Sequence, residues 1–270
     1  QLKPFEFLEF GKIAIPLIIV CIISVLIVIK LLIKKLKIPT RMAYLISIGS
    51  TVCGTTAIMA TAPVIKANKN EVSLANITLF GILSMLIYPY FANIYFDGQP
   101  LLVGLFLGTS IHETSQVAAA GLIYDQQFNS PETLNIATVT KLIRNTFLVI
   151  MIPLFAYLYN RNETKTKNYS LLDIFPYFVL GFIGMIIFRN IGDQLFLTES
   201  TQPIWQTLVL TIKDSAKIFL SMAMAAVGLS TNLKDLKSMG YKPFIVGFTA
   251  MVTVGLVSII TMKVFAELFL

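Results

Sequence analysis

The chain has 270 residues, of which 56% are hydrophobic and only 13% are charged. A soluble domain carries about 25% charged residues, so this composition excludes an ordinary soluble fold and predicts an all-α integral membrane protein. The Lys and Arg excess of cytoplasmic membrane loops explains the net charge of +7, and we expect no nucleic-acid partner. Two cysteines and one histidine fit neither a disulfide framework nor a zinc motif, so we expect no metal and no cofactor.

Apolar segments long enough to cross a bilayer recur along the chain. A spanning helix needs roughly 20 residues, and residues 74–96, for example, contain no charged residue. We therefore predict a single polytopic transmembrane domain over residues 1–270. Its predicted segments in chain order are 13–33, 42–67 (broken or re-entrant), 72–96, 101–124 (broken or re-entrant), 134–159, 171–190, 211–229 and 243–262.

The chain begins with Gln1, and its opening segment resembles a later one. Residues 2–11 and 233–240 are both short amphipathic linkers that precede an apolar helix. The later linker follows another predicted helix, at 216–229, whereas the opening linker follows nothing. We therefore expect the sequence to be truncated at its N-terminus, with at least one more spanning helix before Gln1.

A run of small and polar residues occurs twice inside apolar sequence. Residues 49–60 and 108–119 align without a gap at a spacing of 59 residues, which places Cys53 opposite His112. In a membrane such a run is unfavourable unless it is buried in protein or lines a cavity. Secondary transporters place two related copies around one site. The repeat therefore predicts an inverted-repeat transporter fold with two broken or re-entrant helical hairpins.

Two models of the broken segments differ in where they place Lys66 and Lys69. Positive residues between Lys30 and Arg41 predict that the first helix ends in the cytoplasm. If residues 42–67 cross the membrane, Lys66 and Lys69 lie outside; if the segment is a re-entrant hairpin, both lysines return to the cytoplasm. The hairpin model satisfies every charged loop and gives the two copies opposite orientations, so we favour it over the crossing model.

The polar chemistry is concentrated where the two repeats break. A half-helix that begins inside the membrane has N–H groups without partners and a positive dipole end. Ser and Thr hydroxyls beside such groups form a natural anion site, and glycine allows close backbone approach. Packing between helices, where small residues are common, is the alternative explanation. The candidate anion-binding residues are Cys53, Gly54, Thr55 and Thr56 at the first tip and His112, Glu113, Thr114, Ser115 and Gln116 at the second.

Two basic residues, Lys141 and Arg144, lie in a predicted spanning helix and share one of its faces. Intramembrane charges usually face a cavity or a partner. Three roles stay open for this pair: a counter-charge for the ligand, an ion pair with Glu113, or snorkelling toward the surface. His112 is a candidate carrier of a coupled proton because its charge changes near neutral pH. A histidine that is only hydrogen-bonded is the alternative.

Four ordered motifs resemble a known family. Residues 111–121 are similar to its pattern of Ile or Val, His, Glu or Asp, then Gln-Val and Ala-Gly. Residues 53–58, 141–144 and 223–231 resemble its Cys-Gly-Ala-Ser-Ala-Ile, Lys-x-x-Arg and Ala-Met-Ala-Ala-x-Gly-Leu-x-Thr motifs, with two threonines here in place of Ala-Ser. The family comprises conserved hypothetical membrane proteins, includes the YeiH-type proteins and carries the label sulfate exporter. The resemblance implies sulfate as a substrate and further N-terminal helices.

We therefore predict a secondary transporter of a small anion, such as sulfate or a sulfonate, in the bacterial cytoplasmic membrane. We expect that the protein is not an enzyme and has no catalytic residue. An anion channel on the same scaffold is one alternative, and an intramembrane enzyme is a weaker one because no nucleophile–base pair is visible. The expected partners are a small inorganic or organic anion and the lipid bilayer. A coupling proton or sodium ion and a homo-oligomer stay open.

Overall fold

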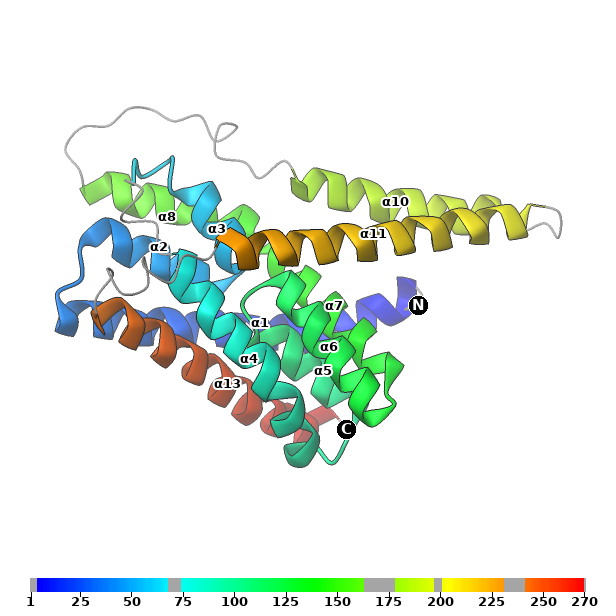
Figure 1. Cartoon of the computed structure of the whole chain (residues 1–270), viewed down its shortest axis with the longest axis horizontal. Coiled ribbons are helices and arrows are strands. Elements are labelled where there is room, and N and C mark those ends of the chain that lie inside the picture. The colour runs from blue at the N-terminus through cyan, green and yellow to red at the C-terminus, as the bar shows by residue number, and fades with distance from the viewer. Residues whose placement is uncertain (1–3, 68–73, 163–177, 197–200, 231–240, 270) are drawn as a thin grey trace. The chain divides into compact units, whose positions relative to one another are not determined.

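The structure is a computed structural model. It describes residues 4–67, 74–162, 178–196, 201–230 and 241–269, and every regular element within these ranges is an α-helix (Figure 1). The chain forms two compact units, unit 1 from Gln1–Phe175 and Thr231–Leu270 and unit 2 from Pro176–Ser230. The helices of unit 1 are α1 (Pro4–Leu36), α2 (Thr40–Thr51), α3 (Gly54–Thr61), α4 (Leu74–Tyr95), α5 (Pro100–Ser110), α6 (Thr114–Phe128), α7 (Pro131–Thr146), α8 (Leu148–Asn162) and α13 (Tyr241–Phe269).

Several helices of unit 1 have the length and composition of membrane spans. A helix satisfies its own backbone hydrogen bonds, as the interior of a bilayer requires. Large apolar side chains such as Ile23, Ile27 and Leu31 of α1 are exposed, as expected of a surface that faces lipid. The predicted all-α membrane fold is confirmed. Four stretches of the described residues could cross a membrane: Gly11–Leu36, Ile77–Tyr95, Pro131–Tyr159 and Tyr241–Val264.

The predicted segment 134–159 contains two helices, α7 and α8. Phe147 lies between them, and its N–H group bonds to the Arg144 carbonyl at 3.2 Å. Pro153 inside α8 has no N–H group and cannot bond to the carbonyl four residues earlier, so the turn after the break is also weakened. The break follows directly after the part of α7 that contains Lys141 and Arg144.

α1 and α13 pack along each other in unit 1 (Figure 1). Val25 and Ile29, in the second half of α1, belong to one buried cluster with Val246 and Ala250, near the start of α13. Because late residues of one helix meet early residues of the other, the two helices are antiparallel. α4 also packs on α13, and the shorter helices α2 and α5 contact both α1 and α13.

α2 and α3 form the first broken pair. The helical backbone is lost at Val52 (φ −124°, ψ −79°) and at Cys53 (φ −138°, ψ 64°). Both helices contact α8. One buried cluster contains Leu45 of α2, Ile65 from just after α3 and Tyr159 of α8. The two outer ends of the pair thus lie at the same end of α8, so the pair folds back on itself as a hairpin.

α5 and α6 form the second broken pair. Extended backbone at Ile111 (φ −88°, ψ 137°) and Glu113 (φ −114°, ψ 141°) separates the two helices. α5 begins shortly after α4 ends, and Tyr124 near the end of α6 donates to Asn93 near the end of α4 at 2.9 Å. Both outer ends therefore lie at the C-terminal end of α4, and this pair also folds back on itself.

Small residues bring α5 into close contact with α7. A Cβ atom at Gly104 would lie 2.6 Å from the Cβ of Ile136, and one at Gly108 would lie 2.5 Å from the Cβ of Thr140. Glycines four residues apart lie on one helix face and let two backbones approach, as is common between membrane helices. This contact fixes the second hairpin against the helix that carries the basic residues.

Unit 2 consists, in its described residues, of α10 (Phe178–Leu195) and α11 (Gln202–Ser230). Trp205 of α11 donates to Asp193 of α10 at 2.7 Å, and its ring stacks on Phe196 at a centroid distance of 5.3 Å. These contacts join the two helices where one leads into the other. The predicted spans 171–190 and 211–229 fall on α10 and α11, except that residues 171–177 lie outside the described residues.

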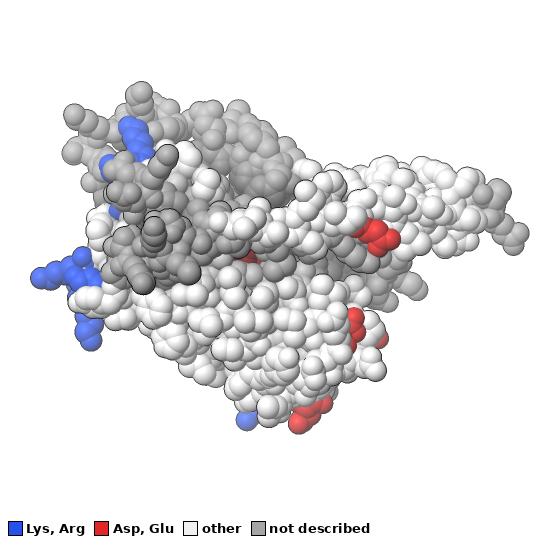
Figure 2. All heavy atoms as spheres, in the orientation of Figure 1, with Lys and Arg blue, Asp and Glu red and all other residues white. Residues whose placement is uncertain are grey.

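The charged side chains of unit 1 are distributed unevenly between its two ends. Figure 2 shows Lys and Arg mostly at the end where α1 leads into α2, and Asp and Glu mostly toward the opposite end, where some basic atoms also lie. Among the described residues, the basic end includes Lys34, Lys35, Lys37 and Arg41, and the acidic end includes Asp97, Asp125 and Glu132. This asymmetry is typical of membrane proteins whose basic end faces the cytoplasm.

Candidate functional site

The two breaks lie against each other inside unit 1. Thr55, in the first turn of α3, donates a hydrogen bond to Oε1 of Glu113, the residue that precedes α6. Cys53 Sγ lies 3.7 Å from Thr114 Oγ1. Both contacts join the first tip to the second, so residues from the two sequence repeats meet at one place.

Gly54 occupies a position at this junction that no other residue would fit well. Its φ of +32° is a conformation that residues with a side chain rarely adopt. A Cβ atom there would lie 3.3 Å from Ile77 Cγ2 and 3.7 Å from both Glu113 Cβ and the His112 carbonyl oxygen. Glycine therefore supplies both the turn into α3 and the close approach of the two tips.

Lys141 of α7 lies directly behind both tips and is fully buried, at 0% exposure. Its ammonium group donates to the carbonyl oxygens of Val52 at 2.8 Å, Ile111 at 2.9 Å and His112 at 2.6 Å. An ammonium group has three N–H donors. All three are therefore used by backbone carbonyls, one from the break between α2 and α3 and two from the break between α5 and α6.

Arg144, one turn further along α7, is 1% exposed and binds the same two half-helices. Nη1 donates to the Thr109 carbonyl of α5 at 2.5 Å, and Nη2 donates to the Ser50 carbonyl of α2 at 3.2 Å. Nε and Nη2 both donate to the Thr51 carbonyl of α2. Arg144 therefore joins the C-terminal end of α2 to the C-terminal end of α5.

These contacts give the two basic residues a clear physical role. The last carbonyls of a helix have no partner within it and carry the negative end of the helix dipole. Lys141 and Arg144 provide hydrogen bonds and positive charge for these carbonyls at two helix ends that are buried together. Neither side chain reaches the surface, and among the described residues no ion pair joins either one to Glu113.

The N-terminal ends of the following helices lie at the same junction. Neither α3 nor α6 has a side-chain hydrogen bond that caps its first turn. Each end therefore contributes partial positive charge and backbone N–H groups. The Thr55 and Thr114 hydroxyls lie in these first turns. The junction thus combines two buried cations, one carboxyl group, the positive ends of α3 and α6 and the negative ends of α2 and α5.

Three side chains of the second tip, His112, Glu113 and Gln116, have buried polar atoms without a hydrogen-bond partner among the described residues; for Gln116 the atom is Oε1. His112 is 2% exposed, and neither Nδ1 nor Nε2 has a partner. Glu113 is 7% exposed, and its Oε2 has none. Burying such groups is unfavourable unless something binds them, so these atoms are candidate binding groups for a polar ligand or water.

The remaining predicted residues lie around this junction. Thr56 is exposed on α3. Ser115 is buried in the first turn of α6, and Gln116 reaches across to α4, where Nε2 donates to the Thr78 carbonyl at 3.3 Å. A Cβ atom at Gly81 would overlap the Gln116 amide, so glycine makes room for this contact. Gln116 therefore joins α6 to the long helix α4.

Asn145 is a further polar residue at the junction, and neither the repeats nor the motifs of the sequence include it. Its Nδ2 donates to Thr114 Oγ1 at 3.0 Å, and its Oδ1 is buried without a partner among the described residues. The sequence does mark it as a candidate, because Asn145 is a polar residue next to Arg144 in a predicted spanning helix. Unlike Lys141 and Arg144, it carries no charge and therefore stands out less in an apolar segment.

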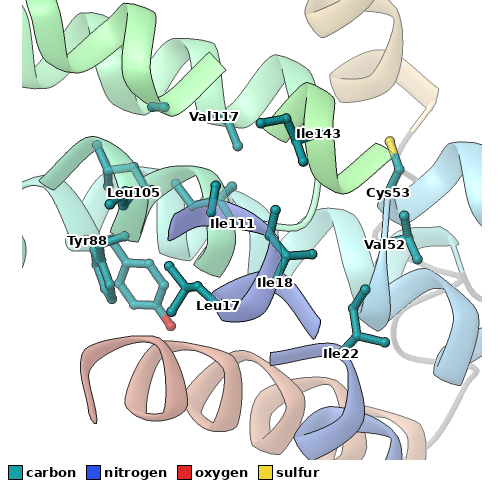
Figure 3. Close-up of a cluster of buried hydrophobic side chains, with 14 of the residues drawn as sticks. Leu17, Ile18, Ile22, Val52, Cys53, Tyr88, Leu105, Ile111, Val117 and Ile143 are labelled. Atoms are coloured by element: carbon teal, nitrogen blue, oxygen red, sulfur yellow. The ribbon is translucent and has the colours of Figure 1, made fainter. Parts of the chain in front are cut away.

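Apolar side chains support the tips. Figure 3 shows Val52 and Cys53, between α2 and α3, and Ile111, between α5 and α6, in one buried cluster. Ile18 and Ile22 of α1 belong to the same cluster. The long helix α1 thus supplies an apolar base for the polar junction, which keeps the two tips in position.

Comparisons with known proteins identify the family. The family model described as Conserved hypothetical protein 698 matches residues 1–247. A UPF0324 membrane protein of Fusobacterium nucleatum subsp. nucleatum is 35% identical over 266 residues, which cover 95% of this chain and 76% of the relative. A UPF0324 membrane protein of Streptococcus agalactiae is 34% identical over 262 residues, which cover 96% of this chain and 75% of the relative.

No solved structure matches the chain. The resemblance to a family of conserved hypothetical membrane proteins is confirmed, whereas the names of the family model and of these relatives mention neither sulfate nor export. The chain is a membrane protein and belongs to the Conserved hypothetical protein 698 family, together with the UPF0324 membrane proteins.

Proposed function

We propose that this protein is a secondary transporter that binds a small anion, such as sulfate or a sulfonate, at the junction of the two broken hairpins. The chain would lie in the cytoplasmic membrane as a multi-pass protein, with the basic end of unit 1 in the cytoplasm. The unequal distribution of charge between the two ends of unit 1 supports this orientation.

The observation that carries the proposal is the charge balance at the junction. Lys141 and Arg144 contribute two positive charges, and Glu113 contributes at most one negative charge. The partial positive charge at the uncapped N-terminal ends of α3 and α6 offsets the partial negative charge at the C-terminal ends of α2 and α5, so the net charge of the junction stays positive. A small anion is therefore a better ligand for this field than a cation.

The protein groups that hydrogen-bond to the anion would differ from the charged groups that attract it. The ammonium donors of Lys141 are all used by carbonyls, and most Arg144 donors are used in the same way. The two cations would therefore act on the anion through their field. The backbone N–H groups of the first turns and the hydroxyls of Thr55 and Thr114 would form the direct hydrogen bonds.

The placement of the hairpins favours a transporter over a channel. The outer ends of the α2–α3 hairpin lie at the C-terminal end of α8, and those of the α5–α6 hairpin lie at the C-terminal end of α4. The two tips therefore meet between opposite ends of unit 1. Such opposed hairpins can open one side of a site at a time, as alternating access requires. An anion channel would use the same residues without a tightly bound state.

A binding assay followed by a flux assay tests the proposal. Full-length protein in detergent is titrated with inorganic sulfate, methanesulfonate and acetate, with choline as a cationic control, and heat release is measured. We expect saturable binding of at least one of the three anions and none of choline. Failure of all three anions to bind would overturn the anion site.

Flux separates the transporter from the other classes. The anion that binds is loaded into proteoliposomes, and exchange against labelled anion outside is followed. Saturable uptake against a concentration gradient is expected of a transporter. Non-saturating conductance would instead identify a channel, and conversion of the bound solute into another compound would revive the enzyme alternative.

A further inference from the structure

Glu113 lies in the position where the proposed anion would bind. It is the residue directly before α6, and its Oε1 accepts a hydrogen bond from Thr55 in the first turn of α3. One carboxyl group is thus held between the positive N-terminal ends of two half-helices. A carboxylate in this position makes the interactions that a bound anion would make.

The surroundings of Glu113 set the conditions under which it can leave this position. The carboxyl group is buried, with 7% exposure, and its Oε2 has no hydrogen-bond partner among the described residues. The titratable groups at the junction are Cys53 of the first tip, the adjacent His112, and Lys141 and Arg144 of α7. With Glu113 ionised, a second anion would have to enter beside a negative charge that is buried and only partly hydrogen-bonded.

We infer that Glu113 is the proton-binding residue of the site, an internal anion that is displaced when the substrate anion binds and the carboxylate takes up one proton. This inference rests on the proposed function and adds the identity of the coupling ion. The proton comes from water and forms an O–H bond on the carboxylate. The entering anion supplies the negative charge that Glu113 loses, so the net charge of the junction is the same before and after binding of a monovalent anion.

Proton uptake and anion affinity are linked by this exchange. Above the pH at which the empty site loses its proton, each bound anion takes up one proton, and the affinity for the anion falls by about tenfold per pH unit. Below that pH the site is already protonated, and binding takes up no proton. Reciprocity requires that bound anion strengthens proton binding to the same extent.

The experiment measures protons released or taken up during anion binding. Full-length protein in a weakly buffered solution with a pH indicator is mixed with inorganic sulfate, or with methanesulfonate or acetate if sulfate does not bind. At alkaline pH we expect uptake of about one proton per bound anion, and the affinity should rise as the pH is lowered. Binding without proton uptake at any pH would overturn this inference and leave the anion site standing. Absence of binding would overturn both.

Variants assign the proton to its residue. In Glu113→Gln, anion binding should persist, its affinity should be independent of pH, and proton uptake should be lost. Glu132→Gln, which neutralises an exposed carboxylate at the start of α7, is the matched control and should behave as wild type. Loss of proton uptake in His112→Gln but not in Glu113→Gln would overturn the assignment. If Glu113→Gln does not fold, Glu113→Asp keeps the carboxyl group on a shorter side chain, and the pH at which anion affinity changes should shift; a pH dependence identical to that of wild type would count against Glu113.

Discussion

Arg144 holds the Thr51 carbonyl oxygen with two nitrogens, Nε at 2.9 Å and Nη2 at 2.7 Å. The planar guanidinium group directs its remaining donors to other carbonyls, among them Thr109 at 2.5 Å. One side chain thereby joins the ends of two half-helices that belong to different hairpins. This contact explains how two broken helix ends can be buried side by side without leaving their carbonyls unpaired.

Replacing Arg144 should therefore destabilise the fold. In Arg144→Gln the carbonyls of Ser50, Thr51 and Thr109 lose a charged donor, and each unsatisfied buried group costs about 1–3 kcal/mol. We expect a free energy of unfolding lower by about 3 kcal/mol or more. Arg144→Lys should be intermediate, because lysine keeps the charge but not the paired geometry. Thermal unfolding of the full-length protein in detergent measures both.

A double variant separates the carbonyl role from an ion pair. If Arg144 acts on carbonyls, Glu113→Gln added to Arg144→Gln should not restore stability. Recovery of a large part of the loss would show instead that the two residues stabilise each other as an ion pair. Lys34→Gln, at an exposed position in the last turn of α1, is the control for loss of a positive charge and should leave the unfolding temperature unchanged.

Two helical glycines should respond oppositely to alanine. At Gly108 a Cβ would lie 2.5 Å from Thr140 Cβ and 2.6 Å from the Ala137 carbonyl, so α5 and α7 must move apart. Overpacking of this kind costs about 1–3 kcal/mol. At Gly181 in α10 no atom lies within 4 Å of the added Cβ, and alanine favours the helix by about 1 kcal/mol. Gly108→Ala should lower the unfolding temperature and Gly181→Ala should not; equal effects would contradict the close packing of α5 and α7.

The sequence could predict where the two repeats break but not what joins them. The alignment of Cys53 with His112 marked both interruptions, because small and polar runs stand out in apolar helices. The position of Lys141 and Arg144 in a predicted spanning helix marked them as candidate site residues, with snorkelling toward the surface as one alternative. Their partners could not be predicted, since backbone carbonyls are present at every position and only the three-dimensional path of the chain shows which ones lack a partner.

The break at Phe147 is a second feature that the sequence did not predict. The predicted segment 134–159 was apolar and long enough for one helix, so nothing in its hydropathy indicated a break between α7 and α8. Asn145 beside that break contacts Thr114, a residue 31 positions away. Contacts between distant segments leave no local pattern, and the role of Asn145 therefore became visible only in the fold.

Thr114 links the proposed ligand to this contact. Its hydroxyl accepts a hydrogen bond from Asn145 Nδ2 at 3.0 Å, and it lies in the first turn of α6. Thr114→Val removes the hydroxyl while keeping a similar shape. A hydrogen bond to a charged group is worth roughly 1.5–3 kcal/mol, so anion binding should weaken by about tenfold or more.

Thr114→Ser is the matched control, because it retains the hydroxyl and loses only a methyl group. We expect its anion affinity, measured by the same titration, to stay close to that of wild type. Equal weakening in the valine and serine variants would show that the side chain matters through its packing. Unchanged affinity in both would place the ligand away from the first turn of α6.

The orientation of the two hairpins gives the last prediction. In a background in which Cys21 and Cys53 are replaced by serine, single cysteines are introduced at Lys66, after α3, and at Asn129, after α6. Both positions are exposed. An impermeant thiol reagent should label the first only from the cytoplasmic side and the second only from outside, because the basic end of unit 1 contains Lys66 and the acidic end follows α6. Labelling of both from outside would mean that the first pair crosses the membrane. The two repeats would then share one orientation, and the opposed openings that alternating access requires would be lost.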